Sequence, residues 1–195
     1  MSNIEDELCD LMKSNFYISN CKSNKKKDPN SLSSLITKSL SQSDCIKLGN
    51  GCEKLFIDII LKKSKLKNIK PKNKKGKKER DHLFEDEENK IIYYSELKAN
   101  INLDTEKSKS TYSKCQSIVK EIHEEYPNHT IKWCLLGYRY LDYKDIPEVI
   151  QKKYGPIKDN LFGVNQYLSM LNIDLQFTNE TYKSFLNKMA EQMFD

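Results

Sequence analysis

Two acidic residues and a lysine fall at the ends of two strand-like segments in the middle of this chain. Asp81 begins the first segment, and the second runs from Ile91 to Lys98 and ends in Glu96-Leu97-Lys98. A short charged turn separates them, which predicts an antiparallel hairpin. Two carboxylates and a lysine on one face of a hairpin can hold Mg²⁺ beside a phosphodiester, because Mg²⁺ takes only one or two carboxylates and also binds phosphate oxygens.

Side chains along a strand alternate between its two faces, so the hairpin's register decides which residues share a face. If the turn is Glu87-Glu88, or a four-residue turn centred on it, Asp81 lies opposite Tyr94 and therefore shares a face with Glu96. A slip of one residue would move Asp81 to the wrong face. Asp86 falls in the turn with the opposite parity, so we predict Asp81 as the first acid.

An acidic residue two positions before a lysine is a common pattern in a lysine-rich chain. It occurs three times, at residues 88–90, 96–98 and 142–144. Residues 88–90 lie in the predicted turn and residues 142–144 follow a strand. Only the pattern at 96–98 ends a buried strand, where placing two charges costs stability unless they are paired or bound. The alternative is a plain cross-strand salt bridge.

A further acid, Glu53, is expected on a helix that opens at Gly49-Asn50-Gly51. Four residues form the apolar face of this helix: Leu55, Phe56, Ile59 and Ile60. Glu53 lies at the edge of that face. Such an acid either meets a partner or a metal ion, or is a first-turn glutamate favoured by the helix dipole.

The elements around the hairpin predict a mixed α/β fold, with antiparallel and central strands flanked by helices. Residues 105–126 have helical spacing, with Asp104 or Thr105 as N-cap and Pro127-Asn128 at the end. The apolar run 131–136 predicts a strand that is covered on both faces. The predicted order is therefore helix, antiparallel strands, helix, central strand.

Additional helices are expected towards both ends, at residues 3–17 and 32–40, at residues 159–171, and after Asn179 as N-cap. No internal repeat or second domain is evident. We therefore expect one domain over residues 1–195, with N-terminal helices to residue 48, a catalytic core at 49–141 and a C-terminal helical part at 142–195.

The composition bounds the class of protein. Of 195 residues, 37% are hydrophobic and 31% are charged, which is typical of a globular domain with its own core. No apolar run approaches the roughly 20 residues of a membrane span, and the acidic N-terminus is unlike a secretory signal, so we expect a cytoplasmic protein. Six cysteines form no Cys-x-x-Cys pair, which favours buried free thiols over zinc or disulfides.

Basic residues gather on both sides of the hairpin. Eleven of the nineteen residues from Lys62 to Arg80 are Lys or Arg, which indicates either a solvated loop or a surface for a polyanion. Residues 100–111 combine amides, hydroxyls and lysines at a helix start, where phosphate contacts or ordinary capping are both expected. The candidate DNA contacts are Asn100, Asn102, Lys107, Lys109 and, beyond the central strand, Arg139.

Residues 49–136 resemble the PD-(D/E)xK nuclease superfamily, and more narrowly its type II restriction endonucleases. The resemblance implies a restriction-endonuclease-like core in which Asp81 and Glu96 bind Mg²⁺, the Leu97 carbonyl is a further ligand, and Lys98 assists the attacking water. Glu53 takes the place of the family's early-helix acid, as a fourth site residue or metal ligand. One departure is that Arg80, rather than proline, precedes the first acid.

The implied activity is site-specific cleavage of double-stranded DNA by a homodimer, alongside a DNA methyltransferase that acts on the same sequence. One alternative keeps the chemistry but changes the substrate, as in a structure-selective repair nuclease or a junction resolvase. Another is a DNA-binding protein without catalysis, in which the acids and the lysine merely pair. A nucleoside triphosphatase is disfavoured because the chain has no glycine-rich phosphate loop.

Overall fold

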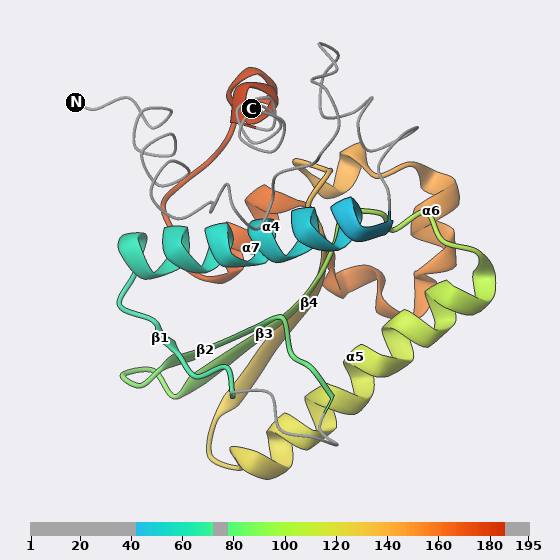
Figure 1. The fold of residues 1–195 in the computed structure, drawn as a ribbon. Helices are drawn as coiled ribbons and strands as arrows, with labels where there is room; N and C mark the ends of the chain where they lie inside the picture. Colours follow the sequence, from blue (N-terminus) through green and yellow to red (C-terminus); the bar gives the residue numbers. More distant parts are fainter. Residues whose placement is uncertain (1–41, 72–77, 186–195) are drawn as a thin grey trace. The chain divides into compact units, whose positions relative to one another are not determined.

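The structure is a computed structural model that describes residues 42–71 and 78–185 (Figure 1). They divide into two compact units, one formed by residues 63–176 and the other by the described residues up to 62 and from 177 onwards. The helices predicted at 3–17 and 32–40 lie outside the described residues.

A five-stranded mixed sheet forms the centre of the larger unit. Its strands lie in chain order: β1 (Lys67–Asn68), β2 (His82–Asp86), β3 (Ile91–Lys98), β4 (Thr130–Gly137) and β5 (Leu161–Phe162). The first three strands pair antiparallel and the last three pair parallel. The predicted mixed α/β class and the predicted antiparallel hairpin are therefore confirmed.

The hairpin's register differs from the predicted one by two residues. His82 pairs with Ser95 and Asp86 with Ile91, so the turn is residues 87–90 and not a turn centred on Glu87-Glu88. The Asp86 carboxylate closes this turn by accepting from the main-chain N–H of Asn89 at 3.0 Å. Since a shift of two residues keeps every side chain on its face, the predicted parity holds although the predicted pairing was wrong.

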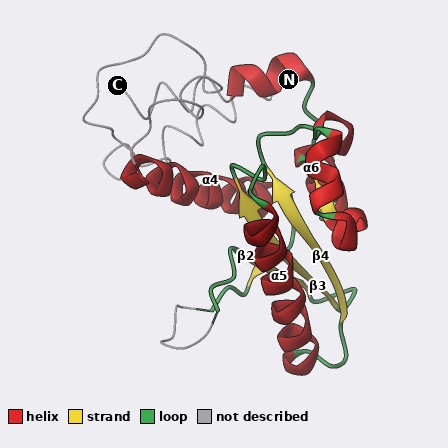
Figure 2. Ribbon diagram, turned by 90° about the vertical axis from the view of Figure 1, so that its right-hand side faces the viewer, coloured by secondary structure: helices red, strands yellow, loops and turns green. Residues whose placement is uncertain are grey.

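Helix α5 (Thr105–Glu125) covers one face of the sheet, here called the α5 face (Figures 1 and 2). Asp104 is its N-cap and accepts from the N–H of Lys107 at 2.8 Å, and Tyr126 is its C-cap, both within the predicted limits. Helix and strands share one buried cluster, made of Leu83, Ile92, Tyr94, Cys115, Ile118 and Ile122. Burial of these apolar side chains holds the helix across the hairpin.

The opposite face, here called the α7 face, is covered by α7 (Val164–Met170). Tyr167 of this helix is buried and its hydroxyl is hydrogen-bonded to Nδ1 of His82. His82 therefore points away from the α5 face, because neighbouring residues of a strand alternate between its faces. Its ring also stacks with that of Tyr167.

The chain between β4 and α7 is less regular than predicted. It contains η1 (Tyr143–Asp145), α6 (Glu148–Lys153), η2 (Gly155–Asn160) and the short strand β5. The helix predicted at 159–171 was wrong at its start, because Leu161 and Phe162 extend the sheet beside Leu135 and Leu136. Gly163 follows, and a Cβ there would lie 2.7 Å from main-chain atoms of Leu141.

In the smaller unit, α4 runs from Gln42 to Lys63. The predicted start at Gly49-Asn50-Gly51 was therefore wrong, since the helix continues through both glycines. Each glycine costs roughly 1 kcal/mol in a helix interior, and the predicted apolar face is buried, which offsets that cost. Residues 179–185 are also helical, and their cap is Thr178, whose hydroxyl accepts from the N–H of Thr181, rather than Asn179.

Two compositional predictions can be compared with the described residues. Cys52, Cys115 and Cys134 are buried free thiols, as predicted. None of the helices that the structure describes combines the length and apolar character needed to cross a membrane.

Candidate active site

The structure brings three predicted residues, Asp81, Glu96 and Lys98, together at one end of the β2–β3 hairpin. Asp81 occupies the bend immediately before β2 rather than a strand position. Because His82 pairs with Ser95, Asp81 stands level with Glu96 on the α5 face. Glu96 is completely buried, and the ammonium of Lys98 lies 2.8 Å from its Oε1.

The main chain of the neighbouring strand fixes the Asp81 carboxylate. Its Oδ2 accepts from the N–H of Leu97 at 2.7 Å. Burial, together with the charge of Glu96, raises the pKa of Asp81 to about 6, although Leu97, Lys98 and Lys114 act in the other direction. A neighbouring negative charge disfavours the ionised form of a carboxyl group, as in acids that share a cation or a proton.

Glu96 is held ionised by its neighbours. Burial alone would raise the pKa of Glu96, but the charges and hydrogen bonds of Lys98 and Lys114 outweigh burial and hold that pKa below its ordinary value. Conversely, burial opposes the charged form of Lys98, but Glu96 raises the pKa of this lysine overall. The Tyr94 hydroxyl donates to Oε2 at 3.2 Å and further fixes the carboxylate.

Lys114 of α5 was not among the predicted site residues. Its ammonium lies 2.8 Å from both Oε1 and Oε2 of Glu96. In the sequence it is one of several lysines of a helix whose inward face is marked by Cys115, Ile118 and Ile122. Nothing local distinguishes Lys114 from its neighbours, because the contact depends on where α5 crosses the sheet.

Arg80 anchors the segment that leads into Asp81. Its side chain is 4% exposed and donates to both carboxylate oxygens of Glu125, at 2.7 and 2.9 Å. A bidentate pair of this kind fixes orientation as well as distance. Residue 80, which directly precedes Asp81, is thus tied to the end of α5.

The donors at this end of the hairpin suit Mg²⁺. In an extended strand the N–H and C=O of one residue point to the same side. The Leu97 N–H points towards Asp81, so the Leu97 carbonyl points to that side of β3 as well. Two carboxylates and one carbonyl are oxygen donors that Mg²⁺ accepts. Within residues 42–71 and 78–185, no three His, Cys, Asp or Glu side chains gather as a metal-binding cluster.

Glu53 lies in the smaller unit, so the structure does not test its place beside the other acids. It is partly buried near the middle of α4. The interpretation of Glu53 as a first-turn residue was therefore wrong, because α4 begins eleven positions earlier.

The predicted DNA contacts lie around the start of α5 and after β4. Asn100 Oδ1 accepts from the N–H of Asn102, whose Oδ1 accepts from Lys153 at 3.1 Å. Lys107 pairs with Asp104 at 3.1 Å, and Lys109 is exposed, whereas Arg139 is partly buried. Capping and turn contacts are thus present, and a role in DNA binding stays a prediction.

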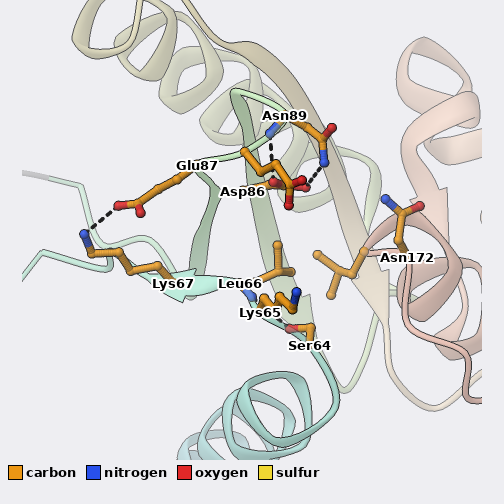
Figure 3. Close-up of a pocket in the computed structure, with 10 residues that line it drawn as sticks. Ser64, Lys65, Leu66, Lys67, Asp86, Glu87, Asn89 and Asn172 are labelled. Carbon is orange, nitrogen blue, oxygen red and sulfur yellow. Dashed lines mark hydrogen bonds and ion pairs between the residues drawn. The ribbon is translucent and has the colours of Figure 1, made fainter.

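A separate hollow of about 430 Å³ lies at the other end of the hairpin, beside the turn (Figure 3). Two of its acidic side chains already have partners. Lys67 contacts Glu87 at 2.8 Å and the Asn89 amide donates to Asp86 at 2.9 Å. The hollow is separate from Asp81, Glu96 and Lys98, which lie at the opposite end of the hairpin.

Comparisons of this chain with protein-family models, with curated proteins and with solved structures found no match.

Proposed function

We propose that this chain is a Mg²⁺-dependent endonuclease of the PD-(D/E)xK type, which hydrolyses phosphodiester bonds in double-stranded DNA as a type II restriction enzyme. The observation that carries the proposal is the position of Asp81 and Glu96 at one hairpin end, with the Lys98 ammonium 2.8 Å from Glu96. The cytoplasmic location, the homodimer and the cognate methyltransferase belong to the same proposal.

The order of the elements supports a restriction-endonuclease-like core. A helix with Glu53 precedes the antiparallel hairpin, and α5 and the parallel strand β4 follow it. This is the order that the resemblance implies. The residues of the motif also occupy the ends of neighbouring strands, where substrates commonly bind.

Asp81, Glu96 and the Leu97 carbonyl are the groups that would hold Mg²⁺. When bound there, the ion would supply positive charge for the phosphate and lower the pKa of nearby water. The chain's own residues provide orientation: the Leu97 N–H fixes Asp81 and the Tyr94 hydroxyl fixes Glu96. Lys98 is a compact cation beside these acids, suited to orienting a water and to stabilising charge on the phosphate.

The test is digestion of plasmid and linear duplex DNA by purified protein with Mg²⁺, on methylated and unmethylated substrates. The protein should give discrete fragments. Asp81→Asn and Lys98→Gln should each lower cutting by at least about a hundredfold, as is typical for loss of a group that orients or stabilises the reaction, while DNA binding in Ca²⁺ persists.

The matched control is Glu85→Gln. Glu85 lies on the same strand and face as Leu83, at the turn end of the hairpin, where it pairs with His129 at 3.3 Å. This variant should cut like the unmodified protein. Unchanged cutting by both site variants would overturn the assignment of the site.

A second candidate is a DNA-binding protein without catalysis. It is favoured by the complete pairing of Glu96 with Lys98, Lys114 and Tyr94. This alternative predicts DNA binding that does not depend on Mg²⁺, and no cleavage of any substrate. Cutting of branched DNA alone, with linear duplex left intact, would instead indicate a junction resolvase or a structure-selective repair nuclease.

A further inference from the structure

Glu96 has two lysine partners where one would neutralise it. The Lys98 ammonium lies 2.8 Å from Oε1, and the Lys114 ammonium lies 2.8 Å from both oxygens. The Tyr94 hydroxyl adds a hydrogen bond to Oε2. Both oxygens of the buried carboxylate therefore already carry a positively charged neighbour in the protein without a bound cation.

The charges at this hairpin end balance as they stand. Asp81 and Glu96 supply two carboxylates, and Lys98 and Lys114 supply two ammonium groups. A doubly charged ion placed beside Glu96 would leave an excess of positive charge in a partly buried site, which is unfavourable unless a lysine leaves. Binding of a metal ion at Glu96 is therefore unfavourable while both lysines remain in contact with its carboxylate.

Lys114 is the lysine that can leave without disturbing the sheet. Lys98 belongs to the same strand as Glu96, two residues further along and on the same face, so its side chain stays beside the carboxylate. Lys114 reaches Glu96 from α5, and its side chain is 33% exposed. Rotation of its flexible stem is enough to carry the ammonium into solvent.

We propose that Lys114 is an internal counter-cation: it occupies the Glu96 carboxylate in the free protein and must withdraw before a divalent metal ion binds there. The inference rests on the proposed function, since it takes Glu96 as a metal ligand. It makes Lys114 the residue that sets the metal concentration at which the site fills. Removal of Lys114 should tighten metal binding, whereas removal of an ordinary structural partner would weaken it.

The experiment is titration calorimetry of the full chain with Mg²⁺ and, separately, Mn²⁺, in the absence of DNA. Lys114→Gln removes the charge, and Lys114→Arg retains it. Lys120→Gln is the matched control, because Lys120 is an exposed lysine of the same helix. Thermal unfolding verifies that each variant is folded, and Glu96 keeps Lys98 as its partner throughout.

Lys114→Gln should bind both ions about tenfold or more tightly than the unmodified chain, as expected when a charged hydrogen bond no longer competes. Lys114→Arg and Lys120→Gln should stay within about twofold of it. Metal binding by Lys114→Gln alone, with none detectable in the unmodified chain, would also support the inference.

Two results overturn the inference and are distinguishable from each other. If the unmodified chain binds metal, Glu96→Gln abolishes that binding and Lys114→Gln leaves it unchanged or weaker, then Lys114 is no counter-cation but the proposed metal site stands. If neither the unmodified chain nor Lys114→Gln binds Mg²⁺ or Mn²⁺ at millimolar concentrations, the inference and the proposed function both fail.

Discussion

The Asp81 carboxylate accepts a hydrogen bond from the main-chain N–H of Leu97, with 2.7 Å between Oδ2 and N. Leu97 is the residue between Glu96 and Lys98, so the first acid of the site is fixed to the peptide that carries the other two charged residues. The relative position of the two carboxylates is therefore set by the backbone of β3 and by the start of β2. Five predictions follow from this arrangement and its surroundings.

Replacing Asp81 should stabilise the metal-free protein at neutral pH. The pKa of Asp81 is about 6 in the folded chain, above its ordinary value of 3.8. The folded state therefore binds this proton more tightly, and the resulting stability is complete below about pH 4 and lost as the pH rises through 6. Asp81→Asn should be more stable than the unmodified chain by up to about 3 kcal/mol at pH 7.5, and about equal at pH 4. Urea denaturation in EDTA at both pH values measures this, and a pH-independent difference would contradict it.

Glu96→Gln should have the opposite effect on stability. The pKa of Glu96 is held below its ordinary value by Lys98 and Lys114, so its contribution is present above about pH 4.5 and lost as the pH falls below it. We expect a loss of roughly 2 kcal/mol at pH 7, the usual scale for hydrogen bonds to a charged group, and a smaller loss at pH 3. Glu85 forms one ion pair among the described residues, with His129. Glu85→Gln should therefore change the free energy of unfolding by less than about 1 kcal/mol at either pH.

Arg80→Met should be strongly destabilising. The Arg80 side chain is 4% exposed and paired with Glu125 at 2.7 Å, and the substitution removes both of its hydrogen bonds to that carboxylate. Because Arg80 is buried and Glu125 is 35% exposed, we expect a cost of about 2 kcal/mol, between that of an exposed pair and that of a fully buried one. Lys78→Met removes an exposed pair with Glu121 at 3.4 Å and should cost less than about 1 kcal/mol. Equal midpoints of urea unfolding for the two variants would contradict the anchoring role of Arg80.

Lys90→Gly tests the turn that sets the register. Lys90 has a φ of 53°, in the left-handed region that glycine adopts without strain. The substitution should raise the free energy of unfolding by up to about 1 kcal/mol, partly offset by the greater freedom of glycine in the unfolded chain. The adjacent Asn89→Gly loses the amide contact to Asp86 at 2.9 Å and should be destabilising. If Asn89→Gly stabilised the protein and Lys90→Gly did not, the turn would have a different conformation from the one described.

Lys109→Gln should weaken DNA binding more than Lys107→Gln, if the proposed function is correct. Both lysines are exposed on the first turns of α5, but Lys107 already pairs with Asp104 at 3.1 Å. Lys109 is exposed and has no ion-pair partner among the described residues, so its charge is the better phosphate partner. Its loss should lower the slope of log K against log salt by about one. Fluorescence anisotropy with duplex DNA in Ca²⁺ at several salt concentrations measures this slope. An unchanged slope for Lys109→Gln would remove this lysine from the proposed contacts.

Two structural features that depend on short stretches of sequence were predicted correctly, namely the shared face of the site residues and the limits of α5. The period-two alternation placed Asp81, Glu96 and Lys98 on one face, and this outcome tolerated an error of two residues in the pairing. The limits of α5 followed from Asp104 and Pro127. The start of α4 was wrong, because glycine propensity is a weak signal beside the buried apolar face that follows it.

The sequence by itself determined the types of residue at the site, their shared face, and the order of the hairpin, α5 and β4. The tertiary structure alone decided that Lys114 reaches Glu96 and that Arg80 is held by Glu125. Both contacts join the hairpin to α5, and they depend on the angle and position at which the helix packs on the sheet. That packing is fixed by the whole buried cluster beneath α5, so no short stretch of sequence encodes it.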